Sequence, residues 1–235
     1  DEEIQAMDEK AKSEAWYKMW RNFCVSDTFE PGSTIKPFTV ATGLEIGALK
    51  GDETYYCGGS LQIDEWEIKC ISYDNGGHGQ QNLTQVMENS CNVALMQIGL
   101  AIGPEFCKYQ SIFGFGQYTG IDLPGEAVGI LQSPDGMIKT DLATNSFGQN
   151  FNVTMLQLAT GFCSLINGGD YYEPHLVKAI QDENGNDCME TQVEDNYQRI
   201  RSEVNQIIKD EMERIKNDPK LRHLIPQPKQ PAGGK

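Results

Sequence analysis

The sequence lacks the features that would direct the chain to nucleic acid or anchor it in a membrane. Its 34 acidic residues outnumber its 19 basic ones, which gives a formal net charge of -15, and no basic stripe appears. Binding to phosphates needs clustered Lys and Arg, so this balance argues against nucleic acid as a partner. No apolar run approaches the roughly 20 residues that span a bilayer, and no signal peptide opens the chain. If the parent protein has a membrane anchor, we expect it to lie outside this sequence.

Cysteine is present in an odd number, and its spacing matches no common framework. The seven cysteines are scattered between Cys24 and Cys188 without any C-x-x-C pair. Neither a dense disulfide framework nor a zinc pattern is indicated, so we expect no metal site and no cofactor. The best candidate disulfide joins Cys57 to Cys70, and the alternative of two unpaired thiols in a loop stays open.

Hydrophobic spacing along the 235 residues predicts mainly helices. The predicted elements are a surface helix in residues 1–22, a buried helix from Ser33 to about Gly47, loops and short strands over 50–82, two helices over 83–103 that meet near Asn89 and Ser90, a turn-dense stretch over 111–140, a buried helix that ends at Gly168 and a strand over 171–180. From about residue 189 the chain becomes strongly charged, which predicts an amphipathic or coiled-coil helix and then a disordered proline-rich tail.

Ser33 and Lys36 stand three residues apart where the turn EPGS meets a predicted helix. A serine hydroxyl needs a neighbouring base to act as a nucleophile, and a lysine can be that base only when its amine is neutral. Positions i and i+3 share a helix face, so we expect the two side chains to hydrogen bond, and burial beside Phe38 should lower the pKa of Lys36. The helix start would also point backbone N–H groups, including that of Ser33, at the oxygen of an attacked carbonyl. The plain alternative is an N-cap serine and a solvated lysine, which the motif alone favours.

Ser90 and Asn92, in ENSCNVALMQ, stand two residues apart at the predicted helix junction. They could present a hydroxyl and an amide to the same cleft, with the serine relaying a proton between the lysine and a leaving group. An ordinary helix cap explains either residue equally well when the segment is taken alone.

Together these motifs resemble the transpeptidase domain of class B penicillin-binding proteins, of the division and sporulation types of Gram-positive bacteria. The resemblance rests on four long segments in family order over about residues 21 to 180: VSDTFEPGSTIKPFTVATGLEIG, GGHGQQNLTQVMENSCNVALMQIG, FGFGQYTGIDLPGE and TNSFGQNFNVTMLQLATGFCSLINGG. It implies an α/β (α+β) fold like that of serine β-lactamases, with an antiparallel five-stranded sheet flanked by helices, an all-helical subdomain, and the nucleophile between them.

The resemblance also implies roles for particular residues. It implies acyl transfer at the D-alanyl-D-alanine end of peptidoglycan stem peptides, with Ser33 as the acylated serine, Lys36 as the general base, and Ser90 and Asn92 as the paired motif. β-Lactams would acylate the same serine. Gly148 and Gln149, in SFGQN, are expected to support the fold and are the candidate substrate-binding residues, whereas His78, the histidine of GGHG, is interpreted as structural.

One departure from the family pattern concerns its third motif, Lys-Thr-Gly or Lys-Ser-Gly, which is absent from this chain. Lys139-Thr140-Asp141 precedes SFGQ and has Asp where the glycine belongs, so we reject it as a substitute. Residues 1–188 are therefore predicted to be a partial transpeptidase domain, and 189–235 a segment foreign to the family. The residue beyond the missing motif should supply a second N–H to the oxyanion. Losing one such donor typically costs about 3 to 4 kcal/mol of transition-state stabilisation, so we expect this chain to be a weak or inactive catalyst.

Two other functions remain open from the sequence. A serine β-lactamase or β-lactam sensor shares both motifs, although no acid is evident that would activate a deacylating water. A non-catalytic interaction fragment with a coiled-coil tail is the third hypothesis. For the first hypothesis the expected partners are stem peptides, β-lactams and cell-wall synthesis or divisome proteins, and the expected location is the outer face of the bacterial cell membrane.

Overall fold

The computed structural model describes residues 2–186 and divides the chain into two compact units, residues 1–176 and 177–235. The second unit is described only up to residue 186, where a turn forms as Asp182 Oδ1 accepts hydrogen bonds from the backbone N–H groups of Asn184 and Asn186. The predicted helix and tail of residues 189–235 lie outside the described residues, and the predicted domain boundary near 188 stays a prediction.

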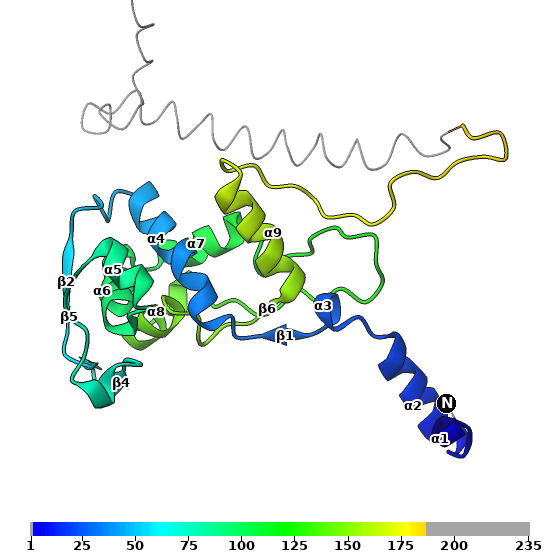
Figure 1. Ribbon diagram of the computed structural model, residues 1–235, viewed down its shortest axis with the longest axis horizontal. Coiled ribbons are helices and arrows are strands. Elements are labelled where there is room, and N and C mark those ends of the chain that lie inside the picture. Colours follow the sequence, from blue (N-terminus) through cyan, green and yellow to red (C-terminus); the bar gives the residue numbers. More distant parts are fainter. Residues whose placement is uncertain (1, 187–235) are drawn as a thin grey trace, which may run out of the picture. The chain divides into compact units, whose positions relative to one another are not determined.

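Helices are the main regular elements of the first unit (Figure 1). The α-helices are α1 (Glu2–Gln5), α2 (Glu9–Trp20), α3 (Phe23–Ser26), α4 (Lys36–Glu45), α5 (Leu83–Glu88), α6 (Asn92–Ile102), α7 (Glu105–Ile112), α8 (Lys139–Asn145) and α9 (Met155–Ile166), and the 3-10 turns are η1 (Gly32–Ile35), η2 (Tyr73–Asn75) and η3 (Pro134–Gly136). Two helices begin with reciprocal capping boxes, Asn82 with Gln85 at α5 and Thr154 with Gln157 at α9. Each box satisfies backbone N–H groups that a helix start leaves unpaired.

The strands pair as three short antiparallel ribbons. They are β1 (Thr28–Phe29) with β6 (Val153–Thr154), β2 (Thr54–Cys57) with β5 (Gly79–Asn82), and β3 (Ser60–Ile63) with β4 (Trp66–Lys69). Helices with small antiparallel sheets make the fold α+β, as predicted. The five-stranded sheet expected from the family is not formed by residues 2–186, whose strands pair only in these twos.

The core of the first unit is built around α6, which packs against α4 and α8 (Figure 1). α6 is apolar on nearly all sides, and its buried residues include Val93, Leu95, Met96 and Ile98. A helix without a polar face is expected to be enclosed by its neighbours. Gly99 lets α8 approach closely, because a Cβ there would lie 2.5 Å from the Cβ of Ser146.

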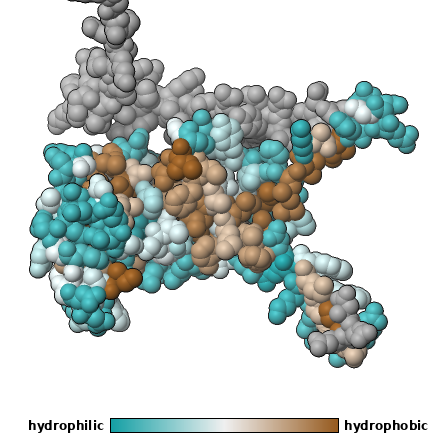
Figure 2. Space-filling model, viewed as in Figure 1, coloured by the Kyte–Doolittle hydropathy of each residue, from teal (hydrophilic) through white to brown (hydrophobic). Residues whose placement is uncertain are grey.

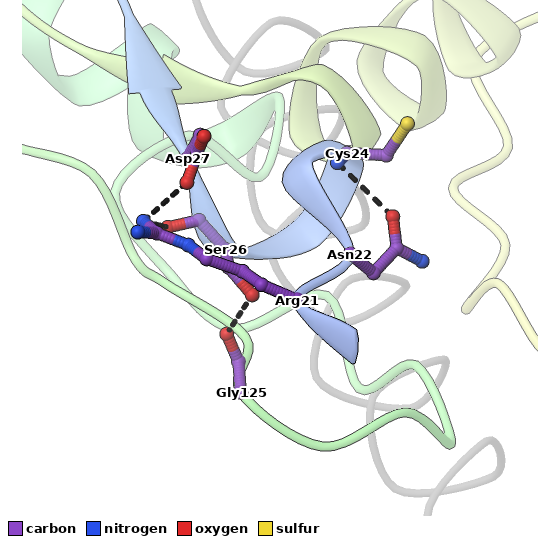
Figure 3. Close-up of polar contacts among 6 residues, drawn as sticks. All are labelled: Arg21, Asn22, Cys24, Ser26, Asp27 and Gly125. Carbon is purple, nitrogen blue, oxygen red and sulfur yellow. Dashed lines mark hydrogen bonds and ion pairs between the residues drawn. The ribbon is translucent and has the colours of Figure 1, made fainter. Parts of the chain in front are cut away.

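The segment that precedes the core is tied to a distant loop by polar contacts (Figure 3). Arg21 forms an ion pair with Asp27 and donates a hydrogen bond to the carbonyl of Ser26 at 3.2 Å. The Ser26 hydroxyl donates to the carbonyl of Gly125 at 2.7 Å, and Asn22 caps α3 by accepting from Cys24 N. By contrast α2, which matches the predicted surface helix, has no buried residue.

Most predicted helices are confirmed, and one predicted strand is wrong. The helix after the serine, the two helices that meet at Asn89 and Ser90, and the helix that ends before Gly168 all form. Residues 171–180 form no strand. Instead residues 171–176 lie against the loop of residues 114–122, where the Leu176 N–H donates to Asp122 and Glu173 lies directly over Gly120. No neighbouring strand among residues 2–186 pairs with it, and Pro174 provides no N–H for a ladder.

The described surface is mixed in polarity. Figure 2 shows apolar side chains gathered over α9, whose Met155 and Ile166 are exposed, while hydrophilic residues cover the side of β2 and β5. Within residues 2–186, none of the helices is both long enough and apolar enough to cross a membrane.

Candidate active site

Ser33 lies in a backbone turn that two segments far apart in the sequence build together. β1 leads into η1, and its ladder with β6 continues as a hydrogen bond of 2.8 Å from Gly32 N to the carbonyl of Gly148. Gly32 has a φ of +56° and Gly148 a φ of +91°, conformations that favour glycine. A Cβ at residue 148 would lie 2.0 Å from the oxygen of Gly32, so the two backbones are in direct contact. This contact leaves Ser33 exposed at the start of the helix.

Lys36 begins α4 directly beneath that turn, and its side chain is buried, with 2% of its surface exposed. Pro37 fits the first turn of the helix, where a missing N–H removes no helical bond. Phe38 anchors this turn against Phe113 and Phe162, with ring centroids 4.9 and 4.8 Å away. Burial lowers the pKa of Lys36 from 10.5 to about 8, although the nearby cysteines oppose the shift.

The second turn of the site joins α5 to α6. Ser90 has a φ of +50°, a left-handed conformation that is strained for a residue with a Cβ. The N–H groups of Ser90 and Cys91 bond back to the carbonyls of Met87 and Val86. The turn therefore ends α5 and places Asn92 as the first residue of α6.

The side chain of Lys36 joins the two turns. Its Nζ donates to the Ser90 carbonyl at 2.6 Å, to Ser90 Oγ at 2.8 Å and to Asn92 Oδ1 at 2.7 Å. Ser90 Oγ in turn donates to Ser33 Oγ at 3.0 Å. The four residues singled out from the sequence therefore form one hydrogen-bonded network in the structure.

The connection between Ser33 and Lys36 differs from the one expected from helical spacing. Among the hydrogen bonds of residues 2–186, none joins Lys36 Nζ to Ser33 Oγ directly, and Ser90 Oγ bridges them. The three N–H groups of Lys36 Nζ are instead taken by acceptors on Ser90 and Asn92, across the site from Ser33.

Gly148 and Gln149 have different positions relative to the site. Gly148 is buried beneath Gly32, which makes it part of the scaffold of the nucleophile turn. Gln149 is exposed and lines a cleft of about 430 Å³ together with Trp66, Glu67, Ile68, Lys69, Asn92, Thr140, Thr144 and Phe147. The cleft therefore begins at the Asn92 end of the hydrogen-bonded network.

The rejected triplet Lys139-Thr140-Asp141 forms the first turn of α8, a helix that begins at the end of the stretch predicted to be turn-dense. Thr140 lines the cleft, whereas Lys139 pairs with Asp64 at 3.9 Å. The triplet therefore does not provide a strand at the side of the cleft.

The cysteines near the site are free thiols, so the candidate disulfide between Cys57 and Cys70 is not formed. Neither cysteine lies in an open loop, because both are buried, with 0% and 4% of their surface exposed. With His78 and Cys91 they form a group whose ligand atoms all lie within 4.8 Å of one another. These four residues could hold a metal ion, a grouping that the missing C-x-x-C spacing concealed.

The comparisons with known proteins define the class to which this fold and site belong. The family model for the penicillin-binding protein transpeptidase domain matches residues 1–235, and the chain belongs to that family. Solved structures agree. A peptidoglycan synthetase from Bifidobacterium adolescentis has a TM-score of 0.66 and 30% identity over 80% of this chain and 33% of its own. Penicillin-binding protein 3 from Mycobacterium tuberculosis, complexed with aztreonam, has a TM-score of 0.65 and 29% identity over 73% and 38%.

Among curated proteins, the relatives are of the class B type. Stage V sporulation protein D of Bacillus subtilis is 40% identical over 161 residues, which are 67% of this chain and 24% of that protein. Peptidoglycan D,D-transpeptidase FtsI of Escherichia coli is 33% identical over 159 residues, 67% of this chain and 26% of that protein. The chain thus spans about a quarter of the length of these relatives.

Proposed function

We propose that the chain carries the acylation site of a serine D,D-transpeptidase that cross-links peptidoglycan stem peptides. The observation that carries the proposal is the network of Ser33, Ser90, Lys36 and Asn92, in which a buried lysine is bound on three sides. The name of the relative FtsI, a peptidoglycan D,D-transpeptidase, supports the same reaction, and the substrate would be the D-alanyl-D-alanine end of a stem peptide.

The hydrogen bonds of Lys36 change in a defined way when its amine loses a proton. As an ammonium it uses three N–H groups for three acceptors. As a neutral amine it keeps two N–H groups, which match the Ser90 carbonyl and Asn92 Oδ1, and its lone pair can accept from the Ser90 hydroxyl. Ser90 Oγ can then accept the proton of Ser33. A neutral Lys36 therefore creates a relay that draws a proton away from the nucleophile.

Acylation would use this relay in both directions. Ser33 Oγ attacks the carbonyl carbon of the penultimate D-alanine, and its proton passes through Ser90 Oγ to Lys36 Nζ. As the peptide bond breaks, the nitrogen of the terminal D-alanine takes a proton back along the same path and leaves as a neutral amine. The acyl group remains on Ser33 until the amine of a second stem peptide attacks it and restores the serine hydroxyl. The N–H of Ser33, at the start of η1, would stabilise the negative oxygen in each step.

Two further elements belong to this proposal. Gln149 and Asn92 would contact the substrate backbone along the cleft, while Gly148 would hold the nucleophile turn in place. The reaction would take place on the outer face of the bacterial cell membrane, where the stem peptides are. β-Lactams, which mimic the terminal dipeptide, would acylate Ser33, and cell-wall synthesis proteins would be the partners of the parent protein.

Labelling with a fluorescent penicillin tests the proposal. We expect a stable adduct on the peptide that contains Ser33, identified by mass spectrometry, and its complete loss in Ser33→Ala. Ser133→Ala is the matched control, because Ser133 is exposed and makes no capping hydrogen bond. Rapid release of hydrolysed drug would indicate a β-lactamase instead. No adduct on a chain that is folded by circular dichroism would support a non-catalytic fragment. The slow labelling expected from the sequence stays a prediction, which the same rates measure.

A further inference from the structure

The cysteine and histidine group beside the candidate active site has the composition and size of a metal centre. Cys57, Cys70 and Cys91 are almost fully buried, and His78 is half-buried. Cys70 Sγ lies 4.0 Å from Cys91 Sγ and 3.7 Å from His78 Nδ1. A tetrahedral zinc ion with bonds of about 2.3 Å to sulfur and 2.0 Å to nitrogen separates its ligand atoms by roughly 3.5 to 3.8 Å. The observed separations therefore need only a small contraction.

Three separate parts of the fold bring these side chains together. Cys57 ends β2 and is paired with Gly79 of β5, so that His78 adjoins its partner across the ladder. Cys70 follows β4, and its N–H bonds to the carbonyl of Gly59 at 2.7 Å. Cys91 is the N-cap of α6, where its side chain caps no backbone group. Backbone hydrogen bonds therefore position Cys57, Cys70 and Cys91 in separate elements of the fold.

Metals bind cysteine as the thiolate, and the surroundings of Cys70 and Cys91 act on that form in opposite directions. Burial raises the pKa of the Cys70 thiol, but hydrogen bonds from the N–H groups of Ser72, Val93 and Asn92 outweigh burial and lower it. Burial raises the pKa of the Cys91 thiol, and the charge of a Cys70 thiolate raises it further. A dication between the two sulfur atoms removes that repulsion.

A buried amide supplies a second, independent observation. Gln81 has 2% of its surface exposed, and its Nε2 has no hydrogen-bond partner among the described residues. The Gln81 side chain is close enough to Cys91 to lower the pKa of its thiol, which favours the thiolate. An unsatisfied buried donor is unfavourable, and a metal-bound sulfur with full negative character would accept its hydrogen bond.

We propose that Cys57, Cys70, His78 and Cys91 bind a zinc ion in a closed tetrahedral site that fixes the turn carrying Ser90 and Asn92. Four protein ligands leave no open position for water or substrate, so the ion is structural and takes no part in acyl transfer. Three soft sulfur ligands and one imidazole select zinc over the oxygen-binding ions magnesium and calcium. Binding displaces the remaining thiol protons to solvent. The Ser72 hydroxyl, 3.1 Å from His78 Nδ1 and 3.8 Å from Cys57 Sγ, can then turn from the imidazole to the sulfur.

The position of Cys91 links the metal site to the candidate active site. It is the residue between Ser90 and Asn92, and both neighbours bond to Lys36 Nζ. Ser90 is strained at a φ of +50°, so the turn persists only when its surroundings hold it. A metal bond at Cys91 would hold it, and loss of the metal would let the serine relax away from the lysine. This consequence rests on the proposed function, whereas the metal site does not.

Metal binding by the reduced full chain tests the site directly. We expect the chain to purify with zinc in equal molar amount, measured by elemental mass spectrometry. Titration of the metal-free chain with cobalt should give the visible bands of a tetrahedral thiolate complex. Cys57→Ser and His78→Ala should each weaken metal affinity at least about tenfold. Cys163→Ser is the matched control, because Cys163 is an exposed thiol, and it should bind as the parent does. The cobalt spectrum of the unmutated chain keeps the test valid if a ligand variant fails to fold.

Several outcomes would overturn the site. One is a reduced, folded chain that takes up neither zinc nor cobalt. Another is a Cys70–Cys91 disulfide in the isolated chain, which would make these residues a redox pair. A third is affinity unchanged in both ligand variants. The result is separable from the proposed function, because a chain that binds zinc but never labels at Ser33 keeps the site and loses the catalytic role. Where labelling occurs, we expect zinc removal to slow it and zinc addition to restore it.

Discussion

Ser33 and Ser90 both lie where a turn meets a helix, and each turn contains one residue in the left-handed region. At the nucleophile turn that residue is Gly32, which adopts a φ of +56° with little strain, and the turn is held by backbone contact with Gly148. At the second turn it is Ser90 itself, at +50°, held by side-chain contacts from Lys36 and by the burial of Cys91. The first turn is therefore fixed by the main chain, whereas the second depends on chemistry that can be titrated, mutated or removed.

Lys36→Met should have the largest effect on this comparison. It removes the group that joins the two turns, so we expect the second-order rate of penicillin acylation to fall by about 10²- to 10⁴-fold. The rate is measured by stopped-flow fluorescence, or by gel labelling followed over time at several penicillin concentrations. Lys12→Met, on an exposed helix with only an i,i+3 ion pair, is the control and should label at the parental rate. Parental labelling by Lys36→Met itself would remove the lysine from the mechanism.

Gly148→Ala tests whether the nucleophile turn is fixed by the backbone. Left-handed strain contributes about 1 to 2 kcal/mol to the loss of stability, and the clash with Gly32 adds to it and displaces Ser33. Gly168→Ala is the matched control, because Gly168 has a φ of +101° with no atom within 4 Å of an added Cβ. We expect denaturant unfolding to show a markedly larger loss for Gly148→Ala, with slower acylation only in that variant. Equal losses in both would mean that the contact of the two backbones is unimportant.

Two substitutions at Ser90 separate the effect of the proton relay from that of backbone strain. Ser90→Ala and Ser90→Gly both remove the bridging hydroxyl, so each should slow acylation on the order of 10²-fold. Only glycine relieves the left-handed backbone, so Ser90→Gly should be about 1 kcal/mol more stable than Ser90→Ala in denaturant unfolding. If the two variants differ in rate instead of stability, backbone position and not the hydroxyl controls the reaction.

The difference between the turns also explains how far the sequence predicts the site. Ser33, Lys36, Ser90 and Asn92 were found because they lie at short, fixed spacings beside helices with clear apolar periodicity. The direct hydrogen bond predicted between Ser33 and Lys36 is not formed, because local spacing does not record that Ser90, far along the chain, would lie between their side chains.

The metal group was missed for a different reason. Its four residues are brought together by strand pairing and by the packing of α6, which no local pattern records. The only signal in the sequence was the stretch of loops and short strands predicted over residues 50–82, which contains Cys57, Cys70 and His78. The strand predicted over residues 171–180 was wrong because a strand needs a neighbour to pair with, and periodicity in one segment does not supply it.

The pH dependence of acylation should show the smallest effect, about tenfold per pH unit over a narrow range. The amine acts as a base only when neutral, and its pKa is about 8, lowered by burial and opposed by the nearby charges of Cys70 and Cys91. Acylation should therefore rise with pH up to about 8 and level off above it. Because unfolding returns the pKa to 10.5, the unfolded chain binds more protons between these values. The free energy of unfolding of the parent, measured relative to Lys36→Met, should thus increase as pH rises through that interval. A rate that is flat from pH ~6 to ~9 would show that proton transfer to Lys36 does not limit the reaction.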